Sequence, residues 1–100
     1  MSNVGSRSMH RKWNRDRNER LFTNLLSRCG IDYSYGKPGD GYDLLVQVQP
    51  MELWEVKDPS RKWTLTQAEQ KRRAYCKRMG IPYRVIEHVD QAAEAIKRNA

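Results

Sequence analysis

The sequence predicts a single α/β domain in which a mixed four-stranded sheet is flanked by helices. The chain has 100 residues, which suits one hydrophobic core and leaves no room for a second. A helical stripe is followed by short alternating stretches, and a second helical pattern separates the last strand from the others. The predicted order is therefore helix, three strands, helix, strand, helix. We expect residues 1–12 to form a flexible basic arm and residues 13–100 to form the domain.

The first helix is expected to start at about Asn14. Its apolar stripe consists of Leu21, Phe22, Leu25 and Leu26, and Gly30 is the expected stop. Glu19 lies at the edge of this stripe. A solvated helix charge and a functional side chain are equally good interpretations of Glu19.

Three strands are predicted over residues 31–35, 42–48 and 51–57, because these stretches are rich in β-branched and aromatic residues or alternate in polarity. Residues 36–41, which contain three glycines, form a loop between the first two strands. Pro50 lies in the reversal that follows. Such short connections favour an antiparallel meander.

The second long helix is predicted from its start and stop signals. Residues 58–62 form an exposed basic loop. Thr66 is followed three residues later by Glu69, which is the spacing of a capping box. Gly80 and Pro82 then end the helix.

The chain closes with a fourth strand over residues 83–86 and a short helix. Because this strand follows a crossover helix, it should run parallel to the third strand. Asp90 is expected to cap the closing helix.

Charge is unevenly distributed along the chain, whose net charge is +7. Residues 1–28 carry +5, residues 29–56 carry −4 and residues 57–84 carry +7. An acidic centre is thus flanked by two basic segments. This pattern fits a cation site framed by surfaces that bind nucleic-acid phosphates. An ordinary small basic domain is the alternative, and charge alone does not decide between them.

Several other classes of protein are excluded by the residue content. Cys29 and Cys76 cannot supply a four-ligand zinc site and are interpreted as reduced thiols. His10 and His88 lack the spacing of a metal site or a catalytic triad. No segment resembles a signal peptide, and no apolar run approaches the roughly 20 residues of a membrane span. We therefore expect a cytoplasmic protein without membrane association.

The candidate site lies between Asp43 and Lys57. Side chains alternate along a strand, so Glu55 and Lys57 share one face while Trp54 and Val56 share the other, where Trp54 is expected in the core. The tight reversal between the two strands would bring Asp43 beside Glu55. Two carboxylates and a lysine would then meet at one point.

Such a set suits phosphodiester hydrolysis. A metal ion polarises a phosphate oxygen and lowers the pKa of the attacking water, and a positive group orients that water or offsets developing charge. Mg²⁺ is content with one or two carboxylates, here Asp43 and Glu55, and the Val56 carbonyl is a further candidate ligand. Taken alone, Glu-x-Lys is a weak motif that usually means an ion pair.

The ordered set of motifs resembles the PD-(D/E)xK nuclease superfamily, and most closely its small VRR-NUC-like members from phages and bacteria, which are related to Holliday-junction resolvases. The resemblance covers residues 14–96. The motifs that carry it are Asn18-Glu19, Gly41-Tyr42-Asp43-Leu44-Leu45-Val46, Glu55-Val56-Lys57 and Leu65-Thr66-Gln67-Ala68-Glu69-Gln70. It implies a restriction-endonuclease-like αβββαβ core, which is the order that periodicity predicts.

The resemblance also implies a role for each matched residue. Asp43 and Glu55 would be metal ligands, and Lys57 would position or activate the water. Gln70 matches a glutamine that family members place on the helix beside the site. Glu19 matches an acid on the first helix that is sometimes a further metal ligand.

Three neighbouring residues need separate interpretation. Tyr42 stands where the name-giving pattern has proline, which leaves the approach of Asp43 less defined. For Glu69 the capping role is preferred over a site role. Trp13 and Trp63 have basic neighbours and would either stack on bases or, as we prefer, cover the edge of the core.

The sequence thus predicts a Mg²⁺-dependent DNA endonuclease, with Mn²⁺ as a substitute and with branched or structured DNA as substrate. The resemblance implies 5′-phosphate and 3′-hydroxyl products. A replication, recombination or packaging protein of a phage or its bacterial host is a candidate partner. A homodimer is expected, because one site cuts one strand. The alternatives are a DNA-binding or adaptor module that kept the fold without catalysis, and a nuclease active only with a partner. The candidate DNA-binding residues are Arg11, Lys12, Arg15, Lys37, Arg61, Lys62, Arg73 and Lys77.

Overall fold

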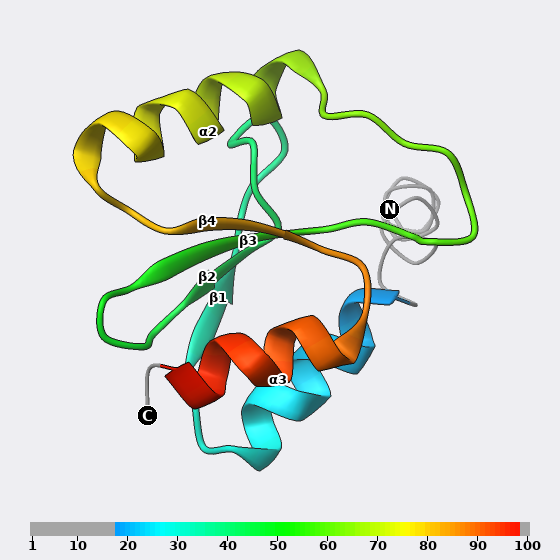
Figure 1. Cartoon of the computed structure of the whole chain (residues 1–100), viewed down its shortest axis with the longest axis vertical. Helices are drawn as coiled ribbons and strands as arrows, with labels where there is room; N and C mark the ends of the chain where they lie inside the picture. Colours follow the sequence, from blue (N-terminus) through cyan, green and yellow to red (C-terminus); the bar gives the residue numbers. More distant parts are fainter. Residues whose placement is uncertain (1–17, 99–100) are drawn as a thin grey trace, which may run out of the picture.

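A computed structural model of the chain describes residues 18–98. In this part of the chain, four strands form one mixed sheet and three helices pack on its faces (Figure 1). The α/β class and the mixed four-stranded sheet predicted from the sequence are confirmed. The predicted basic arm, residues 1–12, and the expected helix start at Asn14 lie outside the described residues.

The sheet has the strand order β1-β2-β3-β4. The strands are β1 Tyr33–Tyr35, β2 Leu44–Val46, β3 Glu52–Val56 and β4 Tyr83–Ile86. The first three are antiparallel neighbours, and β4 runs parallel to β3. The predicted meander and the predicted parallel last strand are therefore both present.

The first three strands are shorter than predicted. The second strand, for example, was expected to continue to Val48, but the Val48 N–H donates to the Val46 carbonyl at 2.9 Å. This short-range bond turns the chain out of the ladder. Alternation of side chains reports where a strand lies more reliably than where its pairing ends.

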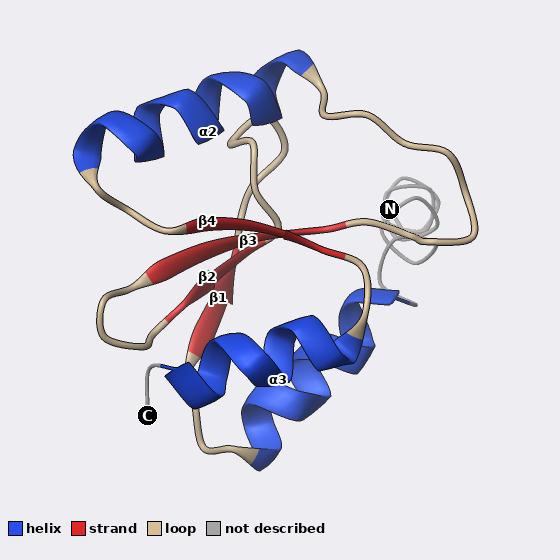
Figure 2. Cartoon of the chain, viewed as in Figure 1, coloured by secondary structure: helices blue, strands red, loops and turns tan. Residues whose placement is uncertain are grey.

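The helices cover the two faces of the sheet unequally. The N-terminal helix, described over residues 18–28, and α3, Val89–Arg98, lie together on one face, and α2, Gln67–Met79, lies on the other (Figure 2). The core lies on the two-helix face and consists of Phe22, Leu26, Leu44, Val46, Trp54, Val56, Ile86, Ala92 and Ala95. The opposite face of β3, which carries Leu53 and Glu55, lies beneath α2.

Helix α2 begins and ends as its sequence signals predict. Thr66 is the N-cap, and its hydroxyl accepts the Glu69 N–H while the Glu69 carboxylate accepts the Thr66 N–H. Gly80, with φ of 74°, forms the left-handed C-cap, and its N–H donates to the Cys76 carbonyl. Both ends of the helix are therefore fixed by local hydrogen bonds. Cys76 is the one fully buried residue of α2.

The prediction that Asp90 caps the last helix is wrong. Helix α3 starts at Val89, so Asp90 lies inside its first turn. The Gln91 side-chain oxygen accepts the N–H groups of Glu87, at 2.6 Å, and His88, at 3.0 Å. These bonds fasten the residues that precede the helix to its first turn.

Both cysteines are free, Cys29 exposed and Cys76 buried, which agrees with their interpretation as thiols. Burial raises the pKa of the Cys76 thiol, which disfavours the reactive thiolate. Among residues 18–98, no helix is both long and apolar enough to cross a membrane.

Candidate functional site

The register of β2 and β3 brings the two predicted carboxylates together. Leu44 pairs with Trp54, so the next position carries Asp43 on one strand and Glu55 on the other. The Asp43 N–H donates to the Trp54 carbonyl at 2.9 Å, and Asp43 Oδ2 accepts the Val56 N–H at 2.7 Å. Asp43 is therefore bound to β3 through both its backbone and its side chain, and it is only 5 % exposed.

Lys57 joins two carboxylates on the α2 side of the sheet. Its Nζ lies 3.3 Å from Glu55 Oε2 and 2.9 Å from Glu69 Oε1. From the sequence, the capping role of Glu69 was preferred over a site role, whereas the structure makes Glu69 both a cap and a neighbour of Lys57. Asp43, Glu55, Lys57 and Glu69 are called the carboxylate–lysine cluster below.

The cluster holds more negative charge than Lys57 balances. Burial of the Glu55 carboxyl, the nearby charge of Asp43 and a hydrogen bond with Glu69 raise the pKa of Glu55 to about 9, against the opposing effect of Lys57. At neutral pH and without a metal, Glu55 therefore keeps its proton. A bound cation would favour the ionised carboxylate and displace that proton.

Lys57 and Glu69 have opposite shifts. Burial lowers the pKa of Lys57, but the hydrogen bond to Glu69 and the charge of Glu55 outweigh it, so the net pKa is raised. For Glu69, burial raises the pKa, but the hydrogen bonds from Lys57 and from the Thr66 N–H outweigh this effect, so the net pKa is lowered. Lys57 is therefore a charged hydrogen-bond donor at neutral pH and not a base.

Glu52, the other buried acid of β3, makes an informative contrast. It is 1 % exposed, and its Oε1 accepts from Arg84 Nε at 2.6 Å and from Trp54 Nε1 at 2.8 Å. This carboxylate is balanced by a guanidinium in a closed structural ion pair. The carboxylate–lysine cluster lacks such a balance, which is typical of sites that bind a cation or perform chemistry.

The residues of the cluster fit a hydrated divalent cation. Within residues 18–98 there is no group of three or more His, Cys, Asp or Glu side chains arranged to hold a metal, but Mg²⁺ needs only one or two carboxylates. The N–H and C=O of one strand residue point to the same side. Since the Val56 N–H points to Asp43, the Val56 carbonyl is directed to that side as well. Asp43, Glu55 and this carbonyl therefore fit the ligand needs of such a cation.

Glu19 is buried on the first helix. It is 2 % exposed, so its interpretation as a solvated helix charge is wrong. Its neighbour Asn18 donates from Nδ2 to the Lys57 carbonyl at 2.8 Å. This bond ties the start of the described helix to the end of β3, beside the cluster. A role for Glu19 as a metal ligand stays a prediction.

Gln70 is not brought into the cluster. Its Nε2 donates to the Leu65 carbonyl at 2.9 Å in an exposed position. Successive residues of a helix are rotated by about 100°, so Glu69 facing the sheet turns Gln70 away from it. The structure thus brings together Asp43, Glu55 and Lys57 and leaves Gln70 outside.

The candidate DNA-binding residues fall into two groups. Lys37, Arg61, Lys62, Arg73 and Lys77 are all exposed. Arg11, Lys12 and Arg15 lie outside the described residues, as does Trp13. The exposed set is free to approach a polyanion, and its role in binding stays a prediction.

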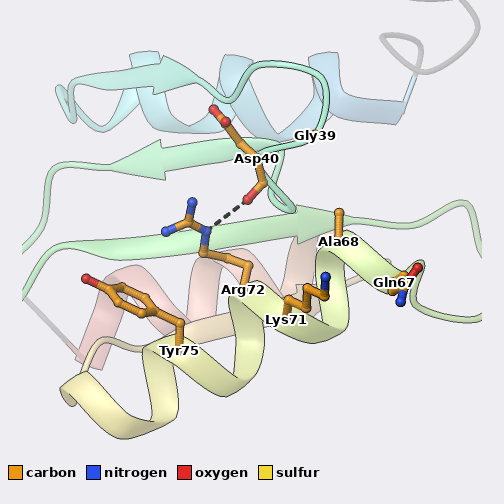
Figure 3. Close-up of a pocket in the computed structure, with 7 residues that line it drawn as sticks. All are labelled: Gly39, Asp40, Gln67, Ala68, Lys71, Arg72 and Tyr75. Atoms are coloured by element: carbon orange, nitrogen blue, oxygen red, sulfur yellow. Dashed lines mark hydrogen bonds between the residues drawn. The ribbon is translucent and has the colours of Figure 1, made fainter.

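A groove of about 700 Å³ lies between α2 and the loop of residues 36–41 (Figure 3). This groove was not predicted from the sequence. Its lining residues are Gly39, Asp40, Gln67, Ala68, Lys71, Arg72 and Tyr75. Arg72 donates from Nε to the Asp40 carbonyl at 2.9 Å, and its guanidinium carbon lies 5.7 Å from the Tyr42 ring centroid and 5.4 Å from that of Tyr75. Arg72 therefore holds the loop that leads to Asp43, a contact between segments that no local pattern reveals.

Trp63 lies beside the site and outside the core cluster, so the preferred core-edge interpretation is not supported. The residue is 38 % exposed, its Nε1 donates to Glu87 Oε2 at 2.6 Å, and the Lys57 ammonium lies 5.8 Å from the ring centroid. Trp63 is thus an exposed aromatic residue next to the cluster.

Comparisons of the chain with protein-family models, with curated proteins and with solved structures found no match. The function is therefore inferred from the residues and geometry of the cluster.

Proposed function

We propose that the protein is a Mg²⁺-dependent DNA endonuclease with a restriction-endonuclease-like core of the PD-(D/E)xK type. The observation that carries the proposal is the meeting of Asp43, Glu55 and Lys57 at the end of β3. Lys57 Nζ lies 3.3 Å from Glu55 Oε2. The N–H of Val56, the residue between Glu55 and Lys57, donates a hydrogen bond to Asp43 Oδ2. The antiparallel meander followed by a parallel fourth strand is the topology expected for such a core.

Each residue of the cluster has a distinct role in this proposal. Asp43 and Glu55 would hold the divalent cation, which would supply Lewis acidity toward a phosphate oxygen and a water. The Val56 N–H fixes the Asp43 carboxylate, so little reorganisation is needed. The Lys57 ammonium donates a hydrogen bond to the water or the phosphate and offsets negative charge in the transition state. Glu69 keeps Lys57 protonated and oriented.

DNA is the proposed substrate because the acidic segment is flanked in the sequence by two basic segments with exposed cations, and phosphate contacts from Lys and Arg release condensed counterions. The proposed substrate is branched or otherwise structured DNA. One chain offers one cluster in its described part, so cutting both strands of a junction requires two copies, and we propose a homodimer on DNA.

Cleavage of supercoiled plasmid and of a four-way junction tests the proposal, with Mg²⁺ or Mn²⁺ compared with a chelator. Asp43→Asn, Glu55→Gln and Lys57→Ala should each lower the rate about 100-fold or more. Glu94→Gln and Lys97→Ala remove matched charges from exposed positions on α3 and should leave the rate unchanged. Lys57→Ala protein with the wild-type rate would exclude this mechanism.

The rival function is a DNA-binding module without catalysis, which the exposed basic residues favour. Salt-sensitive DNA binding with no cleavage under any divalent metal supports it. A nuclease that needs a partner protein gives the same result in that assay. Mn²⁺ binding that depends on Asp43 and Glu55 separates the two, because a pure binding module has no need of a metal site.

A further inference from the structure

Trp63 is an aromatic residue that the hydrophobic core does not require. It lies in the loop between β3 and α2, which leaves the body of the sheet as a long excursion (Figure 1). The residue is 38 % exposed, and its ring is held at one edge by the 2.6 Å hydrogen bond from Nε1 to Glu87. A large ring that is both exposed and fixed loses little conformational freedom on binding a ligand.

The ring also lies at the right distance from the cluster to meet a substrate. The Lys57 ammonium is 5.8 Å from the ring centroid. Nucleotides in one strand are spaced by about 3.4 Å along the helix axis. A base next to a phosphate held at Lys57 would therefore be within reach of the Trp63 ring.

The residues around the ring are of the kinds that bind a nucleic-acid strand. Arg61, Lys62, Trp63 and Thr64 line a groove of about 410 Å³. Two cations, an aromatic ring and a hydroxyl thus lie in four consecutive residues. Cationic grooves with aromatic platforms bind single strands by contacting phosphates and stacking on bases.

We infer that Trp63 stacks on an unpaired DNA base adjacent to the scissile phosphate, so that the preferred substrate carries a single-stranded or branched segment at the site. This inference rests on the proposed nuclease function, which makes the phosphate at Lys57 the scissile one. Paired bases in a duplex are covered by their neighbours on both faces and leave no face for Trp63. The ring therefore discriminates between unpaired and paired DNA.

Binding measured in chelator, where no cleavage occurs, tests the stacking directly. Fluorescence anisotropy would compare a labelled single-stranded oligonucleotide with its duplex. Trp63→Ala should weaken single-strand binding about 10- to 100-fold and duplex binding by no more than about 3-fold, whereas Trp63→Phe should retain most of the affinity. Arg61→Ala, which removes a phosphate contact, should weaken both ligands equally. Equal losses for both ligands in Trp63→Ala would overturn the inference.

Quenching of tryptophan emission gives a second measurement that does not depend on the Ala variant folding. Single-stranded DNA should quench the wild-type protein and a Trp13→Phe control, but not Trp63→Phe. Quenching that persists in Trp63→Phe overturns the stacking role. Cleavage without any Trp63 effect overturns this inference alone. Trp63-dependent binding without cleavage under any metal keeps the stacking site and overturns the proposal that the protein cleaves DNA on its own.

Discussion

Lys57 Nζ and Glu69 Oε1 lie 2.9 Å apart, and the same Glu69 oxygen accepts the Thr66 N–H at 2.9 Å. One carboxylate oxygen therefore closes the cap of α2 and holds the lysine of the candidate site. Because the two bonds share an atom, the start of α2 and the position of Lys57 are coupled. The structural and chemical roles of Glu69 can still be separated by mutation, because one substitution removes the charge that faces Lys57 and another removes the cap.

Glu69→Gln should reduce cleavage more than Thr66→Ala does. Glutamine also serves at this position of a capping box, so the helix start is kept while the charge facing Lys57 is lost. Thr66→Ala removes the cap at a cost of about 1 kcal/mol but leaves the contacts of Lys57 with Glu55 and Glu69 in place. Urea unfolding and the cleavage rate would be measured on both variants. If the cleavage rates of the two variants changed only in proportion to their unfolding free energies, Glu69 would act as a helix cap and not on Lys57.

The stability of the metal-free protein should fall as the pH rises from about 5 to 8.5. In the unfolded chain Glu55 loses its proton near its ordinary pKa of 4.5, whereas in the folded protein that pKa is about 9. Between these values the folded state binds more protons, so the free energy of unfolding decreases with rising pH. Thermal unfolding in chelator would measure this slope.

Glu55→Gln, which mimics the protonated acid, should remove that part of the slope, and the control Glu94→Gln should retain it. Saturating Mn²⁺ should also flatten the wild-type curve, because the cation stabilises the ionised form of Glu55. A slope identical in wild type and Glu55→Gln contradicts the assignment of the raised pKa to Glu55.

Gly41→Ala should destabilise the protein more than Gly39→Ala. Both glycines have positive φ, 83° and 90°, so each substitution costs about 1–2 kcal/mol of backbone strain. A Cβ on Gly41 would also come within 2.4 Å of the Ala68 carbonyl, whereas one on Gly39 meets nothing within 4 Å. The overlap should add about 1–3 kcal/mol. Equal unfolding free energies for the two variants would show that α2 does not pack on the loop in this way.

Local patterns were sufficient for much of the fold. The capping box of Thr66 and Glu69, the stop at Gly80 and the burial of Trp54 each depend on a short stretch of chain, and all three are present. The short reversal after β2 likewise sufficed to predict that Asp43 and Glu55 would meet. These predictions held because sequence neighbours determine them.

Contacts between distant elements were harder to predict. Glu69 was assigned to the cap because the capping box fully explains it, and only the packing of α2 on the sheet reveals its bond to Lys57. The same packing turns Gln70 outward and brings Arg72 to the Asp40 carbonyl. Trp63 was misjudged because an aromatic residue in a polar loop gives no sign of which element it will face.

The central claim is that Asp43 and Glu55 hold a divalent cation beside Lys57. The most direct measurement is an anomalous difference map from crystals of the wild-type protein grown with Mn²⁺ and DNA. We expect a peak coordinated by both carboxylates and the Val56 carbonyl, with Lys57 Nζ within reach of a metal-bound water or a phosphate. A map at saturating Mn²⁺ with DNA bound and no peak between Asp43 and Glu55 would contradict the account.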